Sequence, residues 1–189
     1  WVKFQSKFSP FFKIRKRYST ISYNSPMKYI NHYPKDLQDK IKVLIEKEKL
    51  SSYIKTKYPN AHSFTNDKTL YSYVMDFKNE YFKKFQVSKV MYDGKINVIN
   101  NALGMHSIVS RVQGGKLKSK NEIRVASVFK NMPEEFLEMI VVHELAHFKE
   151  KEHDKAFYNL CTFVMPSYHQ VEFDLRVYLT HVDLFGKLY

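Results

Sequence analysis

Three side chains within a five-residue stretch have the types and spacing of a hydrolytic metal site. His143 and His147 are four residues apart, and Glu144 lies between them. Four residues of α-helix rise about 6 Å and return to within about 40° of the starting direction, so both imidazoles can bind one ion. Neutral imidazole nitrogen suits Zn²⁺, and the carboxylate can accept a proton from water held there. This H-E-x-x-H spacing predicts a zinc-dependent hydrolase with Glu144 as general base.

A third protein ligand is needed, because a catalytic zinc site takes three side chains and keeps one position open. His153 follows, but ten residues after His143 a straight helix leaves it about 80° away from the ligand face. The helix must therefore bend or end by about Glu150, and Asp154 is a suitable cap for a following helix. We prefer His153 as the third ligand. The alternatives are Glu150, Glu152, His169 and Glu172.

The elements that must hold these residues are helical. Pro133 and the two glutamates after it predict an amphipathic helix over about 133–150, since proline and carboxylates suit a helix start. A helix that begins at Asp154 and ends before Pro166 follows, and a last helix covers about 168–183. Helical spacing also predicts helices over 35–57 and from about 66 to 85.

The middle of the chain changes to strand patterns. Segments 89–92 and 95–99 flank Asp93-Gly94, which predicts a hairpin. Further strands are expected at 107–112 and 122–129, separated by a glycine-lysine loop over 114–120 with the sequence GGKLKSK. We therefore predict an α+β fold with N-terminal helices, a small and mostly antiparallel sheet, the metal-binding helix and C-terminal helices.

Composition limits the classes of protein. The net charge is +12, and half of that excess lies in residues 1–26, which hold six Lys or Arg and no acid. We expect this basic extension to be disordered or non-native, either a presequence or upstream translation, because every recognisable feature begins after Met27; residues 27–189 form the domain. No apolar run reaches the roughly 18 residues of a membrane span. A single cysteine, Cys161, favours a reducing compartment, and we expect a cytoplasmic protein.

The run VVHELAHFKEKEHDKAFY over 141–158 resembles the YgjP-like metallopeptidase domain family, a group of bacterial zincin-type hydrolases. The likeness extends over about 27–186, with matching stretches at 90–129 and 167–181. It implies a zincin-like fold, Zn²⁺ held by His143, His147 and His153, and Glu144 as catalytic acid/base. The family's Arg-Trp-Gly-Ser-type motif is replaced here by the segment 111–114, which reads Arg-Val-Gln-Gly.

Three functions fit these features. The first is peptide hydrolysis, in which an extended peptide pairs with the strand near 122–129 if that strand is a free edge. The second is hydrolysis of a nucleoside triphosphate, because Gly114-Gly115-Lys116, Lys118 and Lys120 could bind phosphate. The third is a DNA-associated protease-like module, although the sequence shows no zinc finger or helix-turn-helix pattern and a nucleic-acid partner is not expected. Candidate donors to the developing negative charge are Tyr168, His169, His106 and Arg111.

Overall fold

The computed structural model describes residues 27–96, 104–113 and 116–189, with the backbone alone for 104–113 and 116–120. The basic extension predicted for residues 1–26 lies outside this part. The elements in chain order are α2 (Lys35–Glu46), α3 (Leu50–Lys57), α4 (Asp67–Tyr81), β1 (Val87–Asp93), β2 (Gly104–Gln113), β3 (Lys116–Ala126), the short 3-10 helix η2 (Ser127–Asn131), α5 (Glu134–Ala146), α6 (Lys155–Val164) and α7 (Tyr168–Phe185).

The N-terminal helical region differs from its prediction in one place. The single helix expected over 35–57 is two helices, because the chain turns at Glu48, whose φ of 56° is left-handed. A residue in that conformation ends an α-helix, and the N–H of Lys49 donates to the carbonyl of Leu44 at 2.8 Å there. The predicted start of α4 is confirmed: Asn66 caps it through a reciprocal pair of hydrogen bonds with Thr69.

The sheet has three strands in the order β1-β3-β2. β1 and β3 are parallel, whereas β2 and β3 are antiparallel, so the expectation of a mostly antiparallel sheet is wrong for the first pair. In the described residues Asp93-Gly94 does not begin the expected hairpin, since β1 pairs with β3. The Asp93 side chain instead accepts a hydrogen bond from the N–H of Lys95 at 2.8 Å. Residues 97–99 of that hairpin lie outside the described residues.

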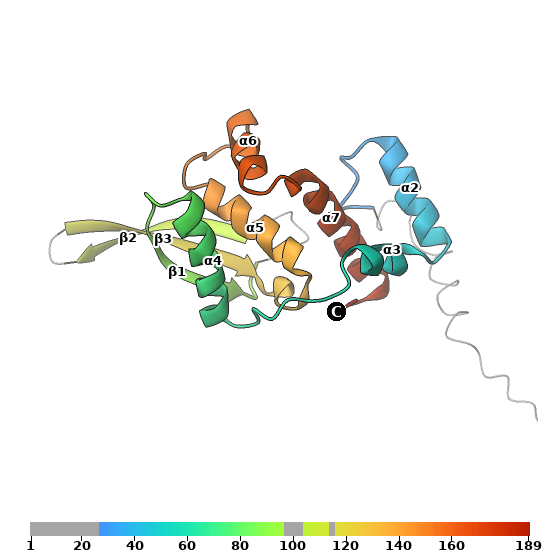
Figure 1. The fold of residues 1–189 in the computed structure, drawn as a ribbon, viewed down its shortest axis with the longest axis horizontal. Helices are drawn as coiled ribbons and strands as arrows, with labels where there is room; N and C mark the ends of the chain where they lie inside the picture. Colours follow the sequence, from blue (N-terminus) through green and yellow to red (C-terminus); the bar gives the residue numbers. More distant parts are fainter. Residues whose placement is uncertain (1–26, 97–103, 114–115) are drawn as a thin grey trace, which may run out of the picture.

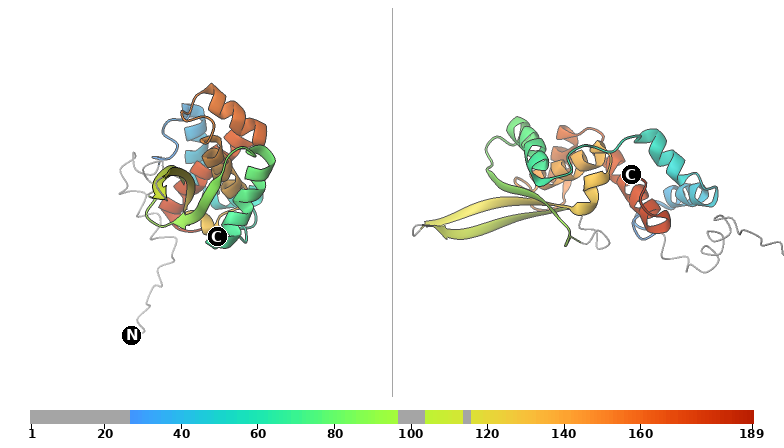
Figure 2. Two further views of the ribbon diagram at one scale, coloured as in Figure 1. Left: turned by 90° about the vertical axis from the view of Figure 1, so that its left-hand side faces the viewer. Right: turned by 90° about the horizontal axis from the view of Figure 1, so that it is seen from below.

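The glycine-lysine loop predicted over 114–120 is also corrected. β3 begins at Lys116, which pairs with Gln113 of β2, so residues 116–120 are strand and not loop. Residues 114–115 lie outside the described part. Figure 2 shows β2 and β3 extending together as a two-stranded arm away from the helices.

α4 and α5 lie on one side of the sheet, and α2, α3 and α7 lie beyond α5 from it (Figure 1). α4 packs against β1, and α5 contacts β2, β3, α4, α6 and α7, so it occupies the centre of the molecule. It is not the amphipathic helix that was expected, because nine of its thirteen residues are buried. The chain is part of this core from Met27 onward, since Met27, Tyr29 and Ile30 are buried. Along the described ranges, no helix combines the length and the apolar character needed to cross a bilayer.

Candidate active site

Three imidazoles converge at the C-terminal end of α5. One potential ligand nitrogen from each of His143, His147 and His153 lies within 4.8 Å of the others. The ring centroids are 4.9 Å apart for His143 and His147, 4.9 Å for His143 and His153, and 4.7 Å for His147 and His153. The structure thus brings together the three histidines that the sequence analysis preferred.

The end of α5 explains how His153 reaches the other two. The helix stops at Ala146, earlier than the predicted residue 150, and the N–H groups of Lys149 and Glu150 both donate to the carbonyl of Ala146 at 3.0 and 2.9 Å. These bonds form a turn after the helix, and His153 follows it outside α5. Asp154 then caps α6, as predicted, with its side chain accepting from the N–H of Phe157 at 3.0 Å. The cap fixes the backbone next to His153.

Phe157, in the first turn of α6, is a supporting residue that the sequence analysis missed. Its ring is fully buried and contacts all three imidazoles, with centroid distances of 4.9 Å to His143, 4.7 Å to His147 and 4.8 Å to His153. A rigid apolar ring beside the three imidazoles restricts their rotation and excludes water. Its position four residues after His153 was the only signal of this role in the sequence.

Hydrogen bonds orient two of the imidazoles. Nδ1 of His147 lies 3.1 Å from the carbonyl oxygen of Glu150, which can only accept, so Nδ1 carries the proton. Nδ1 of His143 lies 2.7 Å from the hydroxyl of Tyr168 on α7. In both residues Nε2 is the nitrogen left for a ligand. Partners of this kind hold histidines in the ring orientation that metal binding needs.

Burial keeps these imidazoles neutral. Desolvation, aided by the charges of His147, His153 and Arg176, lowers the pKa of His143 to about 3. Burial also lowers the pKa of His147. Nε2 of His143 and Nε2 of His153 are 3.1 Å apart, close to the separation of about 3.3 Å between two nitrogens bound tetrahedrally to one zinc ion. The donor set therefore fits a zinc ion.

Glu144 and the alternative ligands occupy different places. Glu144 is buried on α5 beside His143, with 3% of its surface exposed. Among the described residues, none of the alternative ligands belongs to the histidine group. Glu150 pairs with Lys149 at 3.9 Å, Glu172 pairs with Arg176 at 3.1 Å, and His169 and Glu152 are exposed.

The candidate donors to the developing negative charge also lie in different places. Tyr168 contacts His143 and so orients an imidazole, whereas His106 and Arg111 lie in β2, where only the backbone is described. A charged residue that the sequence analysis missed, Arg176, pairs with Glu172 on the face of α7 that carries Tyr168. The signal was its spacing of four residues from Glu172 and eight from Tyr168, which is one face of a helix.

Comparison with known proteins agrees with this site. The family model described as "YgjP-like, metallopeptidase domain" matches residues 37–178, which include the three histidines and Glu144. A curated protein of Escherichia coli (strain K12) named UTP pyrophosphatase is 53% identical over 161 residues, covering 85% of this chain and 96% of the relative. No solved structure gives a significant match.

Proposed function

The chain belongs to the YgjP-like metallopeptidase domain family and is a metal-dependent hydrolase; from that premise we propose that it hydrolyses UTP to UMP and pyrophosphate. One observation supports UTP as the substrate. The relative named UTP pyrophosphatase shares 53% of its residues with this chain over 96% of its own length. A change of substrate class is uncommon when so much of both chains is shared, and this identity supports the nucleotide alternative over peptide hydrolysis.

The metal ligands of this proposal are His143, His147 and His153, and the ion is zinc. Neutral imidazoles with Nε2 available, and a nitrogen spacing of 3.1 Å in one pair, support that assignment. When bound, zinc would supply a Lewis acid that polarises a phosphoryl oxygen and makes water more acidic.

Glu144 supplies the general base. The carboxylate, buried beside the ligand histidines, accepts a proton from the attacking water as its oxygen forms a bond to phosphorus and the phosphoanhydride bond breaks. The proton then leaves with pyrophosphate or passes to solvent. Burial suits this role because it removes competing water from the carboxylate.

The peptidase alternative has less support than it had from the motif alone. Its proposed mode of peptide binding was conditional on a free edge at 122–129, and that condition is not met. β3 is the central strand, and Glu122 to Val125 pair with β1 on one side and β2 on the other. A peptide cannot add to a strand whose hydrogen bonds are already taken on both sides.

The domain and the compartment complete the proposal. Residues 27–189 form the proposed domain, because Met27 is buried in the core and Tyr189 donates a hydrogen bond to the carbonyl of Tyr58. Burial raises the pKa of the Cys161 thiol to about 12, so it is an unreactive core residue. A buried free thiol is consistent with the cytoplasm.

Turnover assays test the reaction. Zinc-loaded protein is incubated separately with UTP and with an unfolded protein, and products are separated by ion-exchange chromatography and gel electrophoresis. We expect UMP and pyrophosphate in equal amounts, and a roughly 100-fold or greater loss of kcat in Glu144→Gln, which keeps the size of the side chain but cannot accept the proton. Cleavage of the unfolded protein without turnover of UTP would overturn the proposal.

Metal analysis tests the ligands independently. We expect about one zinc per chain in the wild type and a loss of most of it in His143→Ala and in His153→Ala. His169→Ala is the matched control, because His169 lies on α7 outside the histidine group and should leave the zinc content unchanged. Zinc retained by His153→Ala but lost from His169→Ala would reverse the assignment of the third ligand.

A further inference from the structure

A group of polar side chains beside the three histidines has no role in holding a metal or moving a proton. We define it as the Arg176 cluster: Arg176 and Glu172 of α7, Tyr158 of α6 and Tyr33, which precedes α2. Nη2 of Arg176 lies 3.1 Å from Oε1 of Glu172. Arg176 also donates a hydrogen bond to the hydroxyl of Tyr33, and its charge acts on Tyr158. Three segments far apart in the sequence thus meet at one guanidinium.

The direction of Arg176 brings this guanidinium toward the histidines. Side chains on a helix lean toward its N-terminus, and residues four apart share a face. The ion pair with Glu172 follows that rule, and Tyr168, one turn further toward the N-terminus, contacts His143. Arg176 thus lies on the face of α7 that carries Tyr168, two turns further along the helix, with its guanidinium leaning back toward Tyr168 and His143.

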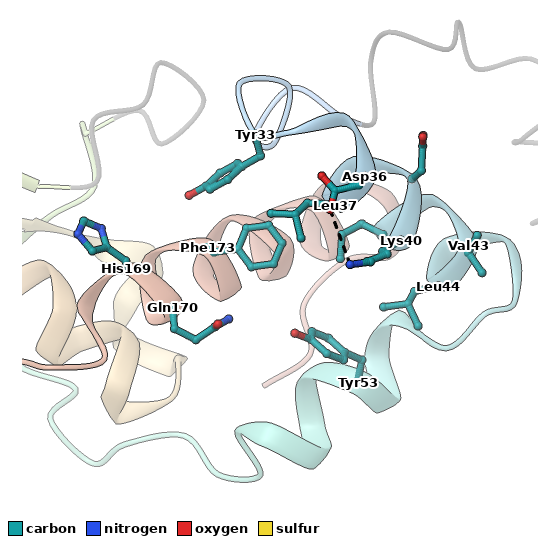
Figure 3. A pocket seen from close by; sticks show the side chains of 12 residues that line it. Tyr33, Asp36, Leu37, Lys40, Val43, Leu44, Tyr53, His169, Gln170 and Phe173 are labelled. Atoms are coloured by element: carbon teal, nitrogen blue, oxygen red, sulfur yellow. Dashed lines mark ion pairs between the residues drawn. The ribbon is translucent and has the colours of Figure 1, made fainter.

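A pocket adjoins the Arg176 cluster at Tyr33. It has a volume of about 950 Å³, and Tyr33, His169 and Phe173 are among its lining residues. Figure 3 shows Tyr33 and Phe173 at the pocket between α2 and α7, and their ring centroids are 4.9 Å apart. Tyr33 belongs both to the pocket and to the cluster, and His169 follows Tyr168 in the chain. Tyr33 thus links the Arg176 cluster to a hollow large enough for part of a nucleotide.

We propose that Arg176 binds a phosphate group of the nucleotide substrate, an inference that rests on the proposed hydrolysis of UTP. The planar guanidinium presents five N–H donors and matches two phosphate oxygens at once. Its side chain is 13% exposed, so it is largely desolvated but still open to a ligand. Glu172 and Tyr33 hold it in place before the substrate arrives, which reduces the entropy lost on binding.

The competing interpretation is a structural clamp, in which Arg176 only ties the segment around Tyr33 to α7. Steady-state kinetics with UTP on zinc-loaded Arg176→Gln and Arg176→Lys separate the two. We expect KM to rise roughly 10- to 100-fold in Arg176→Gln. Arg176→Lys should show a smaller rise in KM, because lysine keeps the charge but cannot make a bidentate contact with phosphate. A clamp would lower the melting temperature and leave KM unchanged.

The matched control is Lys28→Gln. Lys28 also pairs with an acidic residue of α7, Asp183, at 2.7 Å. Asp183 lies seven residues further along the helix than Arg176. The variant removes the same charge and should leave KM within about twofold of the wild type. An equal rise in KM in this control would overturn the proposal, because it would show a general effect of protein charge.

Binding of α,β-imido-UTP, which the enzyme cannot cleave at that bond, gives a readout that does not depend on turnover. Calorimetry should show an affinity loss in Arg176→Gln matching the rise in KM, with zinc content at the wild-type level. Equal affinity of Arg176→Gln and wild type would overturn the inference and leave the proposed function intact. A wild type that neither binds this analogue nor turns over UTP would instead overturn the proposed function, and this inference with it.

Discussion

The two nitrogens of His143 have different partners, and this difference decides what the residue can do. Nδ1 meets the hydroxyl of Tyr168 at 2.7 Å, whereas Nε2 lies 3.1 Å from Nε2 of His153. Burial lowers the pKa of His143, and its Nε2 lies close to that of His153, so one cation can accept a lone pair from each. Tyr168 is nearly fully buried, so its hydroxyl cannot turn to solvent for another partner.

Removal of the Tyr168 hydroxyl tests whether it orients His143 for metal binding. Tyr168→Phe removes the hydroxyl and leaves the ring, and we expect the affinity for zinc to fall by roughly 10- to 100-fold, as for other residues that orient a metal-binding histidine. Competition with a chromogenic chelator measures it. Tyr158→Phe is the control, since the Tyr158 ring lies beside the site with its centroid 6.4 Å from that of His153. Equal affinities in both variants would contradict the role of Tyr168.

At the scale of elements, the connection from α3 to α4 is attached to η2 through His62. Nε2 of His62 donates to the carbonyl of Phe129 at 2.7 Å, and Nδ1 accepts from the N–H of Phe64 at 3.0 Å. Only a neutral imidazole can make both bonds. Burial lowers the pKa of His62 below its usual value, although the bond to Phe129 opposes that shift. η2 leads directly into α5, so this attachment lies close in the chain to the start of the active-site helix.

His62 therefore makes stability depend on pH. The unfolded imidazole takes up a proton below about pH 6.5, while the folded one stays neutral to a lower pH, so its stabilising contribution is complete above that value and is lost as the pH falls. His62→Gln offers one donor and one acceptor without titrating. Melting temperatures at pH 7 and pH 5 should show a smaller decrease in His62→Gln than in the wild type. Equal decreases would show that His62 is not the titrating group.

At the scale of the whole molecule, Asp174 of α7 joins the N-terminal helices to the rest of the core. Its carboxylate is 1% exposed and accepts hydrogen bonds from the hydroxyls of Tyr53 at 3.1 Å and Tyr58 at 2.7 Å, as well as pairing with Lys57. Burial, aided by the carboxylate, raises the pKa of Tyr53 to about 12. A buried charge with this many partners is costly to leave incomplete.

Removing that charge should destabilise the fold. Asp174→Asn keeps the shape of the side chain but weakens every one of these bonds, and we expect the free energy of unfolding to fall by roughly 3 kcal/mol. Urea unfolding at pH 7 measures it. Asp183→Asn on the same helix breaks only the half-exposed pair with Lys28 and should cost about 0.5 kcal/mol or less. Equal losses in the two variants would show that Asp174 does not join the helices in this way.

Local patterns in the sequence predicted most of the elements and the centre of the site. The spacing of His143 and His147, the cap at Asp154 and the cap at Asn66 depend on residues within four positions of one another, and short-range backbone geometry alone decides them. For the same reason the need for the helix to bend or end before His153 could be derived from the 100° that each helical residue turns. The helix ends at Ala146, four residues earlier than expected.

Contacts between distant segments decided the rest. The parallel pairing of β1 with β3 joins residues about 33 positions apart, and no local signal at Asp93-Gly94 could show that this turn does not lead into a paired neighbouring strand. The packing of Phe157 under three imidazoles, and the meeting of Arg176 with Tyr33 across more than 140 residues, likewise arise only when α5, α6 and α7 pack together. His143 and His147 are visible in the sequence because helical spacing relates them; the residues around the proposed substrate are brought there by the tertiary fold.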